Sequence, residues 1–312
     1  MEELTLFTLD TPYRQSLPIK AWKFGDPDKK TLAVIGALRG NELQQMYICS
    51  RLIRKLKELE AEARLSENVG IMVVPCLNQF SMNVGKRFWA ADNSDINRMF
   101  PGYDQGETTQ RIADKIFKAV EGYRYGIAQT SVYLRGTTLP NVRVMHTGYT
   151  DESEGLDFGL PYAVIRMPKP YDTTTLNYNW QIWDTTAMSM YSPYTEQIDT
   201  ESADICVNAI CRFLNRKGYL SGSFAPMSEH PRLVREEALH NILTTEGGFF
   251  NRLCRLGDKV SKGDVLGQIL DPFDNSVREH LLADCDGTVF FMYHPDLVSG
   301  HEIAFRLLPD EL

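Results

Sequence analysis

The sequence lacks any long apolar run. None of its hydrophobic stretches approaches the roughly 18 residues that a membrane-spanning helix needs. It also lacks an excess of basic residues, because 33 Lys and Arg stand against 41 Asp and Glu, for a formal net charge of -8. A surface that binds nucleic acid needs a basic face, so this balance argues against that function. The first residues are acidic and show no basic-then-apolar signal pattern. We therefore predict a cytoplasmic protein with neither a nucleic-acid nor a membrane partner.

Cysteine is also sparse and scattered. No two cysteines form a CxxC pair, which argues against a structural zinc held by thiolates. In a cytosolic protein of this size we expect them to be reduced, buried thiols. The six are Cys49, Cys76, Cys206, Cys211, Cys254 and Cys285.

The chain has 312 residues, which is long for one domain and suits two. Its first two-thirds alternates between strand and helix patterns, whereas the rest contains short β-type runs separated by turn residues. We therefore predict an α/β domain over residues 1–222 and a small all-β domain over residues 223–312.

Hydrophobic periodicity locates the main elements of the first domain. Three apolar runs predict buried strands: residues 31–38, 69–78 and 160–167. Three amphipathic stretches predict helices: residues 41–65, 108–123 and 200–222. A threonine is available as N-cap of the second helix, and a glycine ends the third. Such alternation predicts a mostly parallel or mixed sheet covered by helices.

The stretch "DINRMFPG" places Asn97 and Arg98 beside a Phe-Pro-Gly turn. A guanidinium fork next to an amide can clamp a carboxylate, and Arg87 upstream supplies a second positive donor. The alternative is a surface arginine that pairs with Asp92 or Asp95 and does no chemistry. The residues alone leave both interpretations open.

The order of a strand, an "RGNE" turn, a helix, a second strand, "CLNQFSMNVGKRF" and "DINRMFPG" resembles the succinylglutamate desuccinylase/aspartoacylase family, a branch of the zinc carboxypeptidase-like hydrolases. The resemblance spans nearly the whole chain. It implies a carboxypeptidase-like mixed sheet flanked by helices, followed by a small β-barrel of the barrel-sandwich, lipoyl-like type. A lipoyl or biotinyl carrier needs a lysine at the tip of one hairpin. The corresponding segment "DPFDNS" has none, so we exclude both modifications.

The resemblance also implies a mechanism. In the family, one zinc is held by the histidine and glutamate of an H-x-x-E turn and by a later histidine at a strand end. The ion lowers the pKa of a bound water to about 7. A glutamate acts as general base and acid. Arginines bind the carboxylate of an N-acyl amino acid and the oxyanion that develops as its amide is cleaved.

This sequence departs from that pattern at the metal ligands. Glu42 matches the glutamate, but Arg39 stands at the first ligand position, and arginine has no lone pair to give to zinc. The second histidine matches His146 in one register and Thr130 in another, and the second register fits the intervening length without a gap. In that register His146 is a hydrogen-bonded turn histidine. A relocated metal site built from Glu42, His146 and Asp151 is a third interpretation.

The general base is in doubt for the same reason. Glu196 is the nearest acid and Tyr191 the nearest register match, and an ordinary tyrosine cannot act as a base at neutral pH. Otherwise Glu196 is an exposed acid near a helix N-terminus. The remaining histidines have no metal-binding spacing with an acid partner, and we predict that they are structural or solvent-facing: His230, His240, His280, His294 and His301.

We therefore predict a metal-dependent hydrolase with an eroded zinc site, which cleaves an amide of an N-acyl amino acid or a similar small carboxylate. The alternative prediction is a degenerate member that binds a carboxylate ligand and catalyses nothing, with Arg39 in place of the metal and paired to Glu42. A homo-oligomer is left open. The predicted site comprises catalytic Glu196 and Arg87, substrate-binding Asn97, Arg98 and Arg39, and metal ligands Glu42 and His146.

Overall fold

The computed structural model describes residues 1–10 and 15–311. Contacts divide the chain into two compact units. The first unit comprises Met1–Ser131 and Pro140–Leu233, and the second comprises Val132–Leu139 and the residues from Val234 onward. The short segment before Pro140 therefore belongs to the second unit although the first unit surrounds it in sequence. The boundary between residues 222 and 223 stays a prediction.

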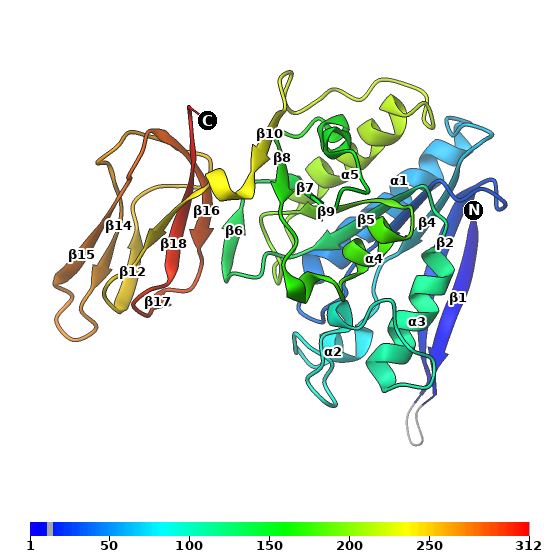
Figure 1. Ribbon diagram of the computed structural model, residues 1–312, viewed down its shortest axis with the longest axis horizontal. Helices are drawn as coiled ribbons and strands as arrows, with labels where there is room; N and C mark the ends of the chain where they lie inside the picture. The colour runs from blue at the N-terminus through cyan, green and yellow to red at the C-terminus, as the bar shows by residue number, and fades with distance from the viewer. Residues whose placement is uncertain (11–14, 312) are drawn as a thin grey trace. The chain divides into compact units, whose positions relative to one another are not determined.

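A mixed sheet of nine strands organises the first unit, in the order β1-β2-β4-β3-β5-β9-β7-β8-β10, and its strands can be followed in Figure 1. The four central strands β4, β3, β5 and β9 run parallel, whereas β1, β2 and β7 pair antiparallel with their neighbours β2, β4 and β9. The predicted mixed sheet is thereby confirmed. The strands are β1 (Glu2–Leu9), β2 (Leu17–Gly25), β3 (Leu32–Ile35), β4 (Gly70–Val74), β5 (Tyr125–Thr130), β7 (Asn141–Met145), β8 (Tyr162–Arg166), β9 (Thr186–Tyr191) and β10 (Arg232–Arg235).

Both faces of this sheet are covered, which explains why its central strands are continuously apolar. Along β3, Val34 belongs to one hydrophobic core and its neighbours Ala33 and Ile35 belong to the other. The first core includes side chains of α1 (Leu43–Ala61) and α5 (Thr200–Arg216). The second includes side chains of α3 (Thr108–Val120) and α4 (Leu176–Ile182). The remaining helical turns are α2 (Gln79–Asn83), η1 (Ile96–Arg98), η2 (Glu152–Phe158), η3 (Pro170–Asp172) and η4 (Glu236–Ala238).

The helix ends differ from the predictions in two instructive places. Helix α1 begins at Leu43, so the "RGNE" segment stays outside the helix as a turn. Glu107, rather than a threonine, is the N-cap of α3, and its backbone N–H donates to Gln110 Oε1 at 3.0 Å. The glycine predicted to end the third helix is Gly218, which follows α5 with a φ of 79°.

The parallel strands β3, β4, β5 and β9 all end at one edge of the sheet, because parallel strands share a direction. The loop after each strand therefore gathers there. Ligands of open α/β sheets bind outside the carboxyl ends of such strands. This edge carries the "RGNE" turn after β3 and the segment from Ser131 after β5.

The second unit contains two antiparallel sheets, as the all-β pattern predicts. One has the order β11-β18-β16-β13, with β6 also paired to β16, and the other has the order β15-β14-β12-β17. The strands of the first are β6 (Gly136–Thr138), β11 (His240–Leu243), β13 (Lys259–Val260), β16 (Gly287–Tyr293) and β18 (Ile303–Pro309). Those of the second are β12 (Gly248–Arg252), β14 (Val265–Leu270), β15 (Val277–Leu282) and β17 (Leu297–Val298). The lysine-free segment "DPFDNS" joins β14 to β15 in an antiparallel hairpin.

Four of the cysteines are buried as predicted, but Cys254 and Cys285 are partly exposed, so the prediction of buried thiols is wrong for these two. Both belong to the small second unit, in which fewer side chains are available to cover them. Among residues 1–10 and 15–311, no helix combines the length and the apolar composition needed to cross a membrane.

We predict that Trp180→Ala lowers the free energy of unfolding by about 3–5 kcal/mol, the usual cost of emptying a buried tryptophan site. Trp180 is fully buried and packs against Gly126, where an added Cβ would lie 2.7 Å from the indole ring. The matched control is Trp183→Ala, because Trp183 is 48% exposed and meets Phe117 only edge-on. Chemical denaturation should show a loss of about 1 kcal/mol for the control. Equal losses for the two variants would contradict this assignment of the core.

Candidate functional site

The turn after β3 carries a buried arginine. Arg39 is 6% exposed, and its guanidinium contacts two carboxyl groups. Its Nη1 lies 3.3 Å from Glu42 Oε1, while its Nε and Nη2 donate to Asp95 Oδ2 at 3.1 and 2.9 Å. Because Glu42 is only three residues away and Asp95 comes from the loop before η1, one guanidinium joins two distant parts of the chain.

Glu42 is fully buried, and both of its oxygens already have partners. Oε2 accepts from the backbone N–H of Arg39 at 3.0 Å. Oε1 accepts from the Ser131 hydroxyl at 2.8 Å and from the Ser131 backbone N–H at 3.3 Å. Arg39, Glu42, Asp95 and Ser131 are called the Arg39 cluster below. The cluster satisfies the hydrogen bonding of its buried carboxylate internally.

Close backbone packing holds this turn in place. The N–H of Gly40 donates to the carbonyl of Arg87 at 2.8 Å, and the carbonyl of Ala37 accepts from the N–H of Leu77 at 3.1 Å. A Cβ at Gly40 would lie 2.3 Å from the Lys86 carbonyl oxygen, so only glycine fits there. Ala37 adopts a φ of 40°, an unfavourable value for a residue with a side chain. The surrounding loops therefore hold Arg39 in a strained, fixed turn.

Electrostatics reinforce this arrangement. Burial alone would lower the pKa of the Arg39 guanidinium, but the carboxylates of Glu42 and Asp95 outweigh that effect and hold the pKa above its ordinary value. Arg39 is therefore a permanent cation in the cluster. Burial also raises the pKa of the nearby Cys76 thiol to about 12, with a smaller contribution from Glu42. Cys76 is consequently protonated at neutral pH and is no nucleophile.

The residues present do not fit a zinc ion at this turn. The Arg39 guanidinium has no lone pair, and it already occupies one oxygen of Glu42. The Ser131 hydroxyl donates to the same oxygen, and Thr130 offers only its carbonyl oxygen to Gln45, at 3.5 Å. Among the described residues, the donor atoms of Glu42 and His146 do not fall within one group that a single ion could bridge.

His146 lies elsewhere in the first unit. It follows β7, its side chain is 46% exposed, and its Nδ1 contacts the carboxylate of Glu152. Asp151, the acid of the relocated-site interpretation, accepts from the backbone N–H and hydroxyl of Ser153 at 2.9 and 2.8 Å. Glu42 therefore contacts Arg39, whereas His146 contacts Glu152, six residues away in the chain.

A second charged cluster begins at Arg98. Its Nη1 donates to the Tyr171 carbonyl at 2.6 Å and lies 3.5 Å from Asp172 Oδ1. Arg166 Nη2 lies 2.9 Å from the other oxygen of Asp172. These three charged side chains are called the Arg98 cluster below. Two guanidinium groups contact one buried carboxyl group, and the Arg98 side chain is 31% exposed.

The pairing of Arg98 differs from the alternative predicted from sequence. Asp95 binds Arg39, and Asp92 accepts from the hydroxyl and backbone N–H of Ser94, so neither is the partner of Arg98. Asn97 has a structural contact, because its Oδ1 accepts from the Leu176 N–H at 3.1 Å. Asp95 and Arg98 stand at the two ends of η1, so this single turn belongs to both clusters.

The remaining predicted residues lie around the same turn. The Arg87 guanidinium lies over the Phe88 ring, 5.4 Å from its centroid. The backbone carbonyl of Arg87 accepts the hydrogen bond from the Gly40 N–H. Glu196 is exposed and accepts from Asn41 Nδ2 at 3.0 Å, which brings the segment after β9 to the "RGNE" turn. Tyr191 is 8% exposed and lies beneath the Arg143 guanidinium at 4.5 Å. The catalytic roles assigned to Glu196 and Arg87 from the sequence stay predictions.

Sequence reasoning missed three members of the two clusters, Ser131, Arg166 and Asp172, and it named Asp95 as a partner of Arg98 rather than of Arg39. Asp95 is the first residue of the "DINR" motif and Ser131 follows Thr130, so both were next to residues already singled out. Asp172 and Arg166 carried no signal, because the contact with Arg98 spans 74 positions of the chain.

Comparison with known proteins supports the same architecture. The family profile of the Succinylglutamate desuccinylase/Aspartoacylase catalytic domain matches residues 28–127. The N-alpha-acetyl-L-2,4-diaminobutyric acid deacetylase of Halomonas elongata is 22% identical over 307 residues, which cover 92% of this chain and 84% of that protein.

Solved structures resemble the chain over nearly its full length. An aspartoacylase family protein of Mesorhizobium loti superposes with a TM-score of 0.75 at 20% identity, covering 94% of this chain and 89% of that one. The product-bound ectoine utilization protein EutE (DoeB) of Ruegeria pomeroyi gives a TM-score of 0.76 at 18% identity, covering 97% and 93%. At these identities the structural likeness shows a shared fold.

We predict that Arg39→Met destabilises the first unit by about 3–5 kcal/mol, because it leaves Glu42 and Asp95 buried without their cation. The control is Arg54→Met. Arg54 is 81% exposed and pairs with Glu58 on the surface of α1, so its loss should change the free energy of unfolding by about 0.5 kcal/mol or less. Urea denaturation measures both. A similar, small effect of the two substitutions would show that the Arg39 cluster is not a buried ion-pair network.

Proposed function

We propose that the chain is a member of the succinylglutamate desuccinylase/aspartoacylase family and that it binds an N-acyl amino acid or a similar small carboxylate without zinc-dependent hydrolysis. One observation carries the proposal: the Arg39 guanidinium contacts Glu42, the residue that matches the family's zinc-binding glutamate. In this proposal Arg39 supplies in a fixed form the positive charge that a metal supplies elsewhere in the family.

Three features support the loss of the metal. Arg39 cannot ligate zinc, Glu42 has no oxygen without a protein donor, and the position after β5 offers Thr130 and Ser131 instead of a histidine. To bind zinc as the resemblance implies, this site would need histidines in place of Arg39 and at the position after β5, and an oxygen of Glu42 without a protein donor. We therefore derive no hydrolytic step through a metal for this chain.

We propose that the Arg98 cluster binds the ligand carboxylate. Arg39 is buried and contacts both Glu42 and Asp95, whereas the Arg98 side chain is 31% exposed beside Asp172, so Arg98 is the guanidinium that a ligand can reach. Guanidinium groups bind carboxylates through two parallel hydrogen bonds, which gives orientation as well as affinity. The Tyr171 ring lies 5.2 Å from the Arg98 guanidinium, a cation–π contact that helps to hold the orientation of that fork.

The second candidate function is amide hydrolysis itself, because a relative that aligns with 92% of this chain is named a deacetylase. Under this candidate Glu196 and Arg87 are the catalytic residues, Asn97 and Arg98 bind the substrate, and Glu42 and His146 hold zinc as originally predicted. The experiment that separates the candidates is incubation of the purified chain with N-acyl amino acids, with and without zinc. Turnover that a chelator abolishes would establish the second candidate and overturn the first.

We propose that the two antiparallel sheets of the second unit form a barrel-sandwich, which the "GDKVSKG" pattern at residues 257–263 supports. We also propose a cytoplasmic location without nucleic-acid or membrane partners, and the homo-oligomer stays a prediction.

We predict that calorimetric titration in the presence of a chelator detects saturable binding of N-acetyl or N-succinyl amino acids. Arg98→Met should weaken that binding by about tenfold or more, since a hydrogen bond to a charged group contributes roughly 1.5–3 kcal/mol. Arg54→Met serves as the control, because it removes an exposed arginine from the far side of α1, and it should leave affinity unchanged. Equal affinity of the Arg98 variant and the unmodified chain would exclude the Arg98 cluster as the carboxylate site.

A further inference from the structure

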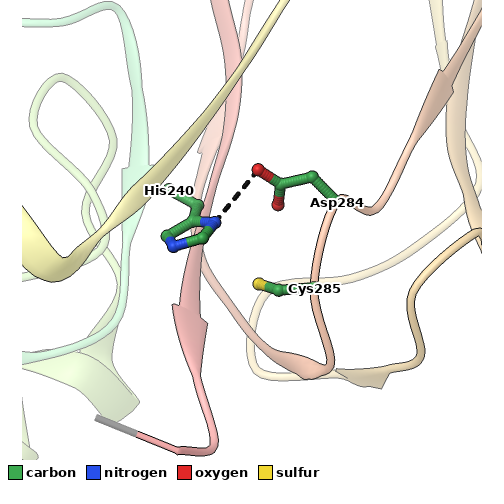
Figure 2. Close-up of side chains that lie close together, drawn as sticks. All are labelled: His240, Asp284 and Cys285. Carbon is green, nitrogen blue, oxygen red and sulfur yellow. Dashed lines mark hydrogen bonds and ion pairs between the residues drawn. The ribbon is translucent and has the colours of Figure 1, made fainter.

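The second unit brings together three side chains that can bind a metal. His240 is the first residue of β11, and Asp284 and Cys285 lie in the loop between β15 and β16. The ligand atoms of the three residues all lie within 4.8 Å of one another, and His240 Nδ1 lies 3.0 Å from Asp284 Oδ2. Figure 2 shows His240 on one backbone segment and Asp284 and Cys285 on another, with the imidazole, the carboxylate and the sulfur directed toward the space between the two segments.

Sheet pairing creates this group. Within one sheet β18 lies between β11 and β16, and Leu307 of β18 pairs with His240 on one side and with Val289 on the other. The start of β11 therefore lies across from the loop that leads into β16. His240 and Asp284 are 44 positions apart in the chain, so no short metal-binding motif in the sequence indicates this group of three residues. The absence of a metal-binding spacing around His240 in the sequence therefore did not exclude an acid partner in the fold.

The loop is held in place without a metal. Asp286 Oδ1 accepts from the Lys262 backbone N–H at 2.7 Å, and the Asp286 carbonyl accepts from the Asp310 N–H at 3.2 Å. The Ala283 N–H donates to the Asp264 carbonyl at 2.9 Å. These bonds tie both ends of the loop to neighbouring segments. The three ligand atoms are thus brought together before any ion arrives, which lowers the entropic cost of binding.

The local charge favours a cation. The carboxyl groups of Asp284, Asp286 and Asp310 surround Cys285, and Lys259 is paired with Asp310. Burial, followed by the charges of these three acids, raises the pKa of the Cys285 thiol to about 11. The free thiol is therefore protonated at neutral pH, which argues against a Cys-His nucleophile at this place.

We propose that His240, Asp284 and Cys285 bind one zinc ion or a similar divalent transition-metal ion. Imidazole nitrogen, carboxylate oxygen and thiolate sulfur are the three ligand types that zinc accepts in proteins. On binding, the ion takes the place of the thiol proton, which is released to solvent, and a sulfur–metal bond forms. Three protein ligands leave the fourth tetrahedral position to water. The ion ties the start of β11 to the β15–β16 loop and so stabilises the folded second unit.

Cobalt(II) is a direct probe for this site, because a cysteine thiolate bound to cobalt gives a charge-transfer absorption that oxygen and nitrogen ligands do not. The full chain, reduced and freed of metal, is titrated with cobalt and then with zinc. We expect one equivalent of cobalt to produce the thiolate band and zinc to abolish it by displacement. The Arg39 cluster contains no cysteine, so an ion bound there would give no such band, and the result does not depend on the function proposed above.

Single substitutions identify the ligands. Cys285→Ser should remove the band, and His240→Ala should weaken cobalt binding by about tenfold or more. Cys254→Ser and His301→Ala are matched controls that should leave the titration unchanged, since both residues are outside the group. All four side chains are at least partly exposed, so the variants are expected to fold, which circular dichroism verifies. Absence of the band in the unmodified chain, or its persistence in Cys285→Ser, would overturn the proposal.

Discussion

The contact between Arg39 and Glu42 determines what the first unit can do. A buried guanidinium can persist beside a buried carboxylate only if each satisfies the other, and here Asp95 and Ser131 complete the arrangement. The family resemblance assigns Glu42 to a metal-binding position, and under the proposed function Arg39 takes the place of the first ligand there. The chemistry of a metal-bound water would then be absent from this turn.

The fold explains why such a change is tolerated. The turn is held by backbone contacts with the loops after β3 and β4 and by the close packing of Gly40, none of which requires a metal. Two hydrophobic cores cover the sheet independently of the site. The η1 turn that carries Asp95 of the Arg39 cluster also carries Arg98, whose side chain is partly exposed. Under the proposed function, recognition of a carboxylate persists at this turn without hydrolysis.

Sequence patterns predicted the helices, strands and turns, because these depend mainly on residues that are close together in the chain. Continuous apolar runs and helical periodicity located β3, β4, α1 and α5, and the "RGNE" and "DINR" motifs pointed to the turn and to η1. The sequence could not reveal contacts between distant segments. Arg98 with Asp172 and His240 with Asp284 are separated by 74 and 44 positions, and only the three-dimensional fold brings each pair together. The sequence likewise could not show that the Ser131 hydroxyl, next to Thr130 in the chain, donates to Glu42.

The most direct test of the account is anomalous X-ray scattering at the zinc absorption edge from crystals grown with zinc. The account predicts no anomalous peak beside Glu42, and electron density there for the Arg39 guanidinium in contact with Glu42 and Asp95. A zinc peak bonded to Glu42, with Arg39 turned away, would contradict it and would restore metal-dependent hydrolysis as the function of the first unit.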